Sequence, residues 1–165
     1  MRPVRISPLE ERHIGGIVEV ERLCQPAPWS ETSFRKEIQH PGGIFLVAEE
    51  GGRIVGYCAC WVIVDEAHII TVAVHPDCRR DGLGTKLVVE TLLHAQERGA
   101  KCATLEARVS NEAAIALYSK LGFVHCGVRP LYYPNDRESA AVMWLHDLAR
   151  WSAPARPRSP EPEQA

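Results

Sequence analysis

The chain has 165 residues, of which 45% are hydrophobic and 24% charged, and its net charge is -2 at pH 7. These values are typical of one globular domain with a buried core. The small net charge argues against a nucleic-acid-binding or membrane-surface role, because such proteins usually carry a basic excess. No apolar run reaches the roughly 20 residues of a membrane helix, and residues 1–12 lack the apolar core of a secretory signal. We therefore expect a cytoplasmic protein with no direct contact to nucleic acid or membrane.

Apolar periodicity and turn residues predict ten elements. In chain order they are a helix over 8–23, a helix over 30–38, strands over 44–50, 53–64 and 67–74, a helix over 82–98, a strand over 101–107, a helix over 111–121, and strands over 123–131 and 139–145. This order predicts an α/β (α+β) fold with a mixed sheet. Residues 1–150 are expected to form the domain. Residues 151–165 are rich in proline and charge, which predicts a disordered tail.

The cysteines and histidines give no metal-binding pattern. There are six cysteines but no Cys-x-x-Cys pair, and the seven histidines include no His-x-x-x-His pair. Cys58 and Cys60 lie two apart in a predicted strand, so they should share one face of it. We expect free thiols and no metal site, since buried free cysteines are common in protein cores.

Arginines and glycines gather where the third predicted strand passes into a helix, in the stretch HPDCRRDGLG (residues 75–84). A helix N-terminus presents unpaired N–H groups and the positive end of the helix dipole, which together attract anions. The glycines would admit a phosphate close to the backbone, and Arg79 and Arg80 would add charge-assisted contacts. The stretch therefore suits a pyrophosphate, although by itself it could equally be a capped helix with surface arginines.

The stretch SNEAAIALYSKLGF (residues 110–123) opens the next predicted helix. Together with HPDCRRDGLG it resembles the GCN5-related N-acetyltransferase (GNAT) family. PWS near the start, LEAR, and RPLYYP near the end resemble the RimI-type branch, whose members acetylate the N-terminal alanine of a ribosomal protein. The resemblance spans about residues 4–148. It implies a sheet of about six or seven strands that splays at the cofactor site, with about four flanking helices.

The resemblance also implies that acetyl-CoA binds between two splayed parallel strands. The pantetheine would pair with the backbone of one strand, the pyrophosphate would lie on the following loop, and an asparagine at the second helix would help to hold the cofactor. The cofactor-binding residues implied in this way are Val72, Ala73, Val74, Arg79, Arg80, Asp81, Gly82, Leu83, Gly84, Thr85 and Asn111. Asn111 would at the same time suit a helix cap.

The branch carries its catalytic glutamate and tyrosine at the positions of Glu106 and Tyr118. Attack by an amine needs a base to accept a proton, and the leaving thiolate needs an acid, while a backbone N–H near Val74 could stabilise the oxyanion. Glu106 breaks an otherwise apolar or small stretch, but it could instead pair with Arg108 on the same strand face. Tyr118 could equally be a core residue with its hydroxyl at the edge.

Glu66 and His68, at the start of the third strand, are an alternative base. The resemblance places a last hairpin, with Tyr132 and Tyr133, and the segment around Trp29 and Phe34 over the acceptor groove. The tyrosines could alternatively just pack on each other.

The expected acceptor is a protein or peptide N-terminus, most simply that of a ribosomal protein, and the expected oligomeric state is a monomer or weak dimer. A lysine or small-molecule amine is the alternative acceptor. A third hypothesis is that the chain is a non-catalytic sensor that binds acyl-CoA.

Overall fold

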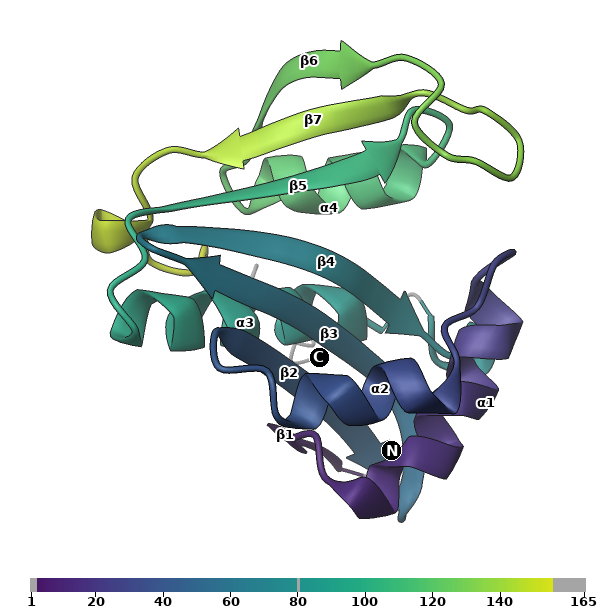
Figure 1. The fold of residues 1–165 in the computed structure, drawn as a ribbon. Helices are drawn as coiled ribbons and strands as arrows, with labels where there is room; N and C mark the ends of the chain where they lie inside the picture. The colour runs from purple at the N-terminus through teal and green to yellow at the C-terminus, as the bar shows by residue number, and fades with distance from the viewer. Residues whose placement is uncertain (1–2, 80, 156–165) are drawn as a thin grey trace, which may run out of the picture.

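A seven-stranded mixed sheet forms the centre of the molecule in the computed structural model, which describes residues 3–79 and 81–155 (Figure 1). The strands are β1 (Val4–Pro8), β2 (Gly43–Glu50), β3 (Arg53–Ile63), β4 (Glu66–Val74), β5 (Cys102–Arg108), β6 (Val124–Arg129) and β7 (Ala140–Leu145). The α-helices are α1 (Ile14–Cys24), α2 (Glu31–Ile38), α3 (Leu83–Glu97) and α4 (Glu112–Lys120). The strand order is β1-β2-β3-β4-β5-β7-β6. The predicted α/β class with a mixed sheet is confirmed.

The first strand, β1, was not predicted from the sequence, which indicated a helix from residue 8 onward. Instead, β1 pairs antiparallel with β2 along five residues, and α1 begins only at Ile14 after a short 3-10 turn. The segment VRISP is short, and Pro8 ends it, so it carries too few apolar side chains for a strand signal. Backbone pairing with the second half of β2 therefore holds these residues as a strand, although their own sequence pattern does not predict one.

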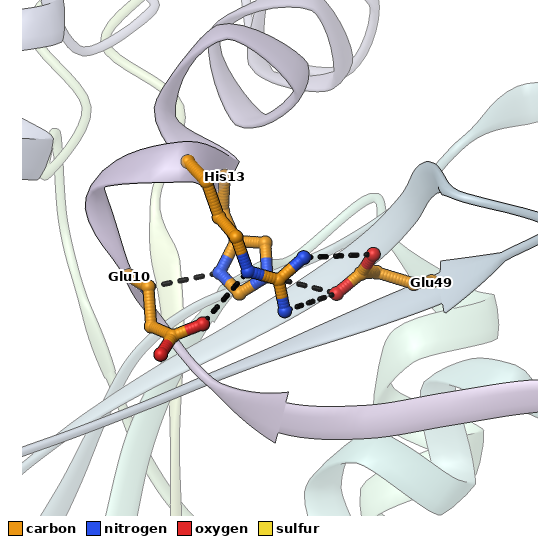
Figure 2. A network of polar contacts seen from close by, with 4 residues as sticks. Glu10, His13 and Glu49 are labelled. Carbon is orange, nitrogen blue, oxygen red and sulfur yellow. Dashed lines mark hydrogen bonds and ion pairs between the residues drawn. The ribbon is translucent and has the colours of Figure 1, made fainter.

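A polar network fixes the passage from β1 to α1 (Figure 2). The His13 side chain is 2% exposed, and its Nδ1 accepts a hydrogen bond from the Glu10 backbone N–H at 2.9 Å. Its Nε2 lies 2.8 Å from Glu49 Oε1 at the end of β2. Arg12 bridges Glu10 and Glu49. Because Nδ1 must stay an acceptor for Glu10, the imidazole carries its proton on Nε2 and donates it to Glu49.

Helices cover the two faces of the sheet and divide the core into two clusters. On one face α1 and α2 pack against β2 and β3, around Phe34, Phe45 and Tyr57. On the other face α3 and α4 enclose the larger cluster, which includes Leu87 and Met143.

The parallel neighbours β4 and β5 part after a short shared stretch. Their ladder joins only Glu66 with Cys102, Ala67 with Ala103, and His68 with Thr104. Beyond these pairs the strands diverge (Figure 1). After His68, β4 pairs with β3 alone, and after Thr104, β5 pairs with β7 alone, among the described residues. The sheet is therefore split between the carboxyl-terminal halves of β4 and β5, where ligands bind in open α/β sheets.

Cys58 and Cys60 share the α3 face of β3, as predicted, and both are buried. Burial raises the pKa of each thiol to about 12, so both stay protonated and unreactive near neutral pH. Over the described residues, no helix combines the length and the apolar character that a membrane crossing requires.

Candidate active site

A cavity of about 450 Å³ opens between the start of α3 and the side of α4. Val72 and Val74 from β4 and Leu117 from α4 give it apolar walls, and Gly82 and Gly84 form its floor. It lies at the split between β4 and β5. Its volume is within the range of small-molecule sites.

The first turn of α3 presents free N–H groups to this cavity. Gly82 is the N-cap residue, with φ at 75°, and no side chain caps the helix. This left-handed backbone conformation favours glycine. A Cβ on Gly84 would lie 3.5 Å from Leu117 and 3.6 Å from Val74, so a side chain there would fill the space between α3 and α4. The glycines therefore keep an anion-attracting helix end open.

The structure gathers most of the predicted cofactor residues around this cavity. Those that line it are Val72, Val74, Arg79, Gly82, Leu83, Gly84 and Thr85. Ala73 lies on the opposite face, in the cluster with Phe34 and Tyr57, so only its backbone could reach a ligand in the split. Asp81 lies farther out, in a neighbouring cavity, and Arg80 lies outside the described residues.

Arg79 lies across the end of β4. Its Nε donates to the Val74 carbonyl at 3.1 Å, and its Nη2 lies 3.5 Å from the Cys24 sulfur at the end of α1. The guanidinium thus stands beside the last backbone carbonyl of β4, with the cavity on one side and α1 on the other. This placement adds a positive charge at the mouth of the split.

A second cavity, of about 200 Å³, continues the first through the split. Both cavities are lined by Val72, Ala114 and Tyr118. A bulge in β4 shapes the passage, because β3 residue Ala59 pairs with Thr71 and the next, Cys60, pairs with Ile69, which leaves Ile70 as the extra residue. Bulges of this kind re-aim side chains next to functional sites.

Glu106 lines the second cavity from β5. Its neighbours Leu105 and Ala107 belong to the cluster under α3 and α4, so Glu106 projects from the opposite face. One carboxylate oxygen accepts from the Tyr132 hydroxyl at 3.3 Å, and the other lies 3.4 Å from Arg129 Nε. The side chain is 28% exposed, so its carboxylate is open to an incoming ligand.

The alternative in which Glu106 pairs with Arg108 is wrong. Arg108 Nη1 instead donates to both carboxylate oxygens of Asp136 at 2.9 and 2.8 Å, and Arg108 Nη2 donates to Asn135 at 2.9 Å. Its guanidinium also stacks 4.0 Å from the centre of the Tyr133 ring. Arg108 therefore fixes the loop between β6 and β7, while Glu106 faces the cavity.

Tyr118 lies on α4, on the other face of the sheet from Glu106, and lines both cavities. It is 8% exposed and packs edge-on against Phe123, with ring centroids 5.7 Å apart. Burial raises the pKa of its phenol, and the thiol of Cys58 and the hydroxyl of Tyr133 raise it further. The hydroxyl therefore keeps its proton at neutral pH and can serve only as a donor of one. This placement also agrees with the alternative of a core tyrosine whose hydroxyl lies at the edge of the core.

Asn111 caps α4, its side chain accepting from the Ala114 N–H at 3.2 Å. It also lines the second cavity, together with Tyr133.

Tyr132 and Tyr133 pack edge to face, with ring centroids 5.0 Å apart. The alternative of mutual packing is therefore correct. Both rings also lie beside the site, because Tyr132 donates a hydrogen bond to Glu106 and Tyr133 lines the second cavity.

Phe34 is placed away from the groove that the resemblance implied. It is completely buried and packs against Trp29, Phe45 and Tyr57. Trp29 is half-buried at the surface of this cluster, and its backbone N–H donates to Glu21 Oε1 at 3.2 Å. Phe34 thus supports the loop between α1 and α2 from below, because its place on α2 turns it toward the sheet.

Glu66 and His68, the alternative base, lie in the stretch where β4 and β5 are still paired. His68 Nε2 lies 3.1 Å from Glu66 Oε2. Neither lines the two cavities at the split.

Two residues of the site were not among the predicted ones. Arg129 lies beside Glu106, and Gln25 lies on the wall of the smaller cavity. Arg129 is the first residue of the RPLYYP stretch, which was a signal for it, whereas nothing in the local sequence marks Gln25, since its place depends on how α1 packs.

Comparison with known proteins places this site in a family. A model of the acetyltransferase (GNAT) family matches residues 14–123. The [ribosomal protein bS18]-alanine N-acetyltransferase of Escherichia coli K12 is 35% identical over 142 residues, which cover 85% of this chain and 95% of that protein. The crystal structure of the ribosomal-protein-S18-alanine N-acetyltransferase from Escherichia coli has a TM-score of 0.79 at 34% identity, covering 87% of this chain and 93% of that one. Ard1 from Thermoplasma volcanium has a TM-score of 0.79 at 26% identity, covering 86% and 96%.

Proposed function

The chain belongs to the acetyltransferase (GNAT) family, and from this premise we propose that it transfers the acetyl group of acetyl-CoA to the N-terminal α-amine of a protein, the N-terminal alanine of a ribosomal protein being the first candidate. The relatives named for this reaction support the acceptor. The observation that carries the proposal is the joint lining of one small cavity by Glu106 and Tyr118 from opposite faces of the split sheet.

The residues present fit acetyl-CoA. Apolar walls from Val72, Val74 and Leu117 suit the pantetheine arm, and the uncapped first turn of α3 suits the pyrophosphate. The unpaired backbone of β4 beyond His68 has hydrogen-bonding groups to offer along the split. When bound, acetyl-CoA supplies the thioester whose acetyl group is transferred.

The two titratable residues divide the proton transfers between them. Glu106 accepts the proton that the amine must lose before its nitrogen can attack. Tyr118 holds its proton, because burial raises its pKa, and can deliver it to the sulfur as the C–S bond breaks. One N–C bond forms and one C–S bond breaks. The leaving sulfur takes the proton of Tyr118, and the second proton that the nitrogen loses after attack returns to the Tyr118 oxygen, which restores the phenol.

A site with one carboxylate base suits an α-amine better than a lysine side chain. At a pKa of about 8, roughly a tenth of α-amines are neutral at pH 7, against about one lysine in 2,500 at a pKa of about 10.4. Deprotonation costs roughly 1 kcal/mol in the first case and nearly 5 in the second. One carboxylate at 28% exposure can meet the smaller demand.

A panel of short peptides tests the proposal. Peptides that begin with Ala, Ser or Met and carry one internal lysine are incubated with acetyl-CoA, while free thiol is measured and mass spectrometry locates the acetyl group. Acetyl on the α-amine, with Ala preferred, is the expected result. Acetyl on lysine alone would refute the proposed acceptor, and binding of acetyl-CoA without turnover of any peptide would favour a sensor.

A further inference from the structure

A third cavity, of about 840 Å³, adjoins the cofactor site on the outer side of α3 and α4. Gly82 and Thr85 line both this cavity and the one at the start of α3. The two cavities therefore adjoin at the first turn of α3. A ligand whose phosphates lie on that turn can extend from one cavity into the other.

The far wall of this cavity comes from the C-terminal segment Ala153, Pro154 and Ala155. This segment lies beyond residue 123, where the match to the family model ends. The residues facing it come from α3 and the end of α4, which are distant in sequence. The wall thus lies outside the residues that the family model matches.

Trp151 fixes the start of the segment. Its indole N–H donates to the Leu121 carbonyl at the end of α4, at 2.8 Å. Its own carbonyl accepts from the Gln96 side chain on α3 at 2.9 Å, and the same amide donates to the Leu148 carbonyl at 2.9 Å. Its ring packs on the core beneath α3 and α4. The chain therefore leaves the core at a defined point and passes directly along the cavity.

The charges of the cavity suit a phosphorylated nucleoside. Lys86 projects from α3 and Lys120 from the end of α4, and both line the cavity beside the apolar Val89. Asp81 and Glu90 lie on the same lining, so a bound phosphate depends on the two lysines, and an uncharged base can lie against the apolar surface. Proline and alanine offer a flat apolar wall without a charge of their own.

We propose that residues 153–155 form a wall of the acetyl-CoA site and hold its 3′-phosphoadenosine end against α3 and α4. The inference rests on the proposed use of acetyl-CoA and adds to it a contribution of the C-terminal segment. The segment acts on binding of the donor and leaves the transfer chemistry at Glu106 and Tyr118 unchanged.

Two truncated chains test the wall. Removal of residues 152–165 deletes it and keeps the Trp151 anchor, whereas removal of residues 156–165 keeps it and serves as the matched control. Isothermal titration calorimetry measures Kd for acetyl-CoA and for acetyl-4′-phosphopantetheine, which lacks the adenosine. We expect the longer deletion to weaken acetyl-CoA binding about tenfold, because two or three methylene-sized contacts suffice for one factor of ten in Kd. Binding of acetyl-4′-phosphopantetheine should not change, and the shorter deletion should alter neither Kd.

An unchanged acetyl-CoA Kd after the longer deletion would overturn the inference. Equal weakening of both ligands would also overturn it, because the segment would then act on the fold or on the pantetheine arm. A point variant gives an independent arm: Lys120→Gln should weaken acetyl-CoA more than acetyl-dephospho-CoA, whereas Lys101→Gln, at the start of β5, should weaken neither. Failure of the proposed function looks different, since the full chain would then bind acetyl-CoA and acetylate no α-amine.

Discussion

Replacing Glu106 by glutamine removes the proposed base and keeps the shape of the side chain. A glutamine oxygen can still accept from the Tyr132 hydroxyl, which now lies 3.3 Å away. The ion pair with Arg129, at 3.4 Å between partly exposed groups, is lost. Such pairs are worth at most about 1 kcal/mol, so Tm should change little.

The expected effect on catalysis is much larger. A positioned general base contributes about 10²- to 10⁴-fold, which corresponds to roughly 3 to 5 kcal/mol of barrier. We therefore expect kcat/KM to fall by at least about a hundredfold at pH 7. Because the variant must use amines that are already neutral, its rate should rise about tenfold from pH 7 to pH 9, as the neutral fraction of a group with a pKa of about 8 increases. The wild-type profile should rise less.

Thiol release from acetyl-CoA with an alanine-initiated peptide, followed between pH 6 and pH 9, measures both quantities. The matched control is Glu66→Gln, which changes a carboxylate that bonds to His68 in the paired part of β4. It should retain the wild-type rate within about twofold, as surface substitutions away from a site usually do. Wild-type rates in the Glu106 variant, or the loss appearing in the Glu66 control, would refute the assignment of the base.

Three further predictions concern side chains around the site. Tyr118→Phe should lower kcat about a hundredfold and leave the Kd for acetyl-CoA nearly unchanged, and loss of both together would mean a structural role. Phe34→Ala should cost about 3–5 kcal/mol in urea unfolding, against at most about 0.5 kcal/mol for Leu23→Ala at 53% exposure; equal costs would contradict the placement of Phe34. Burial raises the pKa of Glu21, so its stabilising contribution is present below the unfolded pKa of about 4.3 and is lost as pH rises through the folded pKa. Glu21→Gln should therefore gain free energy of unfolding relative to wild type as pH rises above about 4.3, and a difference that does not change with pH would contradict the sign.

The parts of the site that local sequence determines were predictable. Gly82 and Gly84 lie at the start of α3, after β4 and a short 3-10 turn. Asn111 and Tyr118 are separated by seven residues, which places them on one side of a helix. Strand-to-helix junctions of this kind depend on a few neighbouring residues. Together with the family resemblance, their positions in the chain indicated a cofactor site before any packing was known.

The parts that depend on packing were not predictable. Arg129 and Tyr132 reach Glu106 only because β7 lies between β5 and β6 in the sheet, and that register cannot be read from any of the three segments. Phe34 illustrates the same point for a helix. Its aromatic ring suits a groove or a core equally well, and only the orientation of α2 on β2 turns it inward.

The split sheet separates the two reactants of the proposed transfer. Leu105 faces α3 and α4, so Glu106, its neighbour on β5, meets an acceptor that arrives from the other face. In the proposed transfer, Tyr118 and the first turn of α3 would meet the donor on the face that α3 and α4 cover. The reacting atoms can meet only within the split, where a single cavity touches both faces. Changes at Tyr132 should therefore raise KM for the peptide, and changes at Gly84 should raise KM for acetyl-CoA, each with little effect on the other constant.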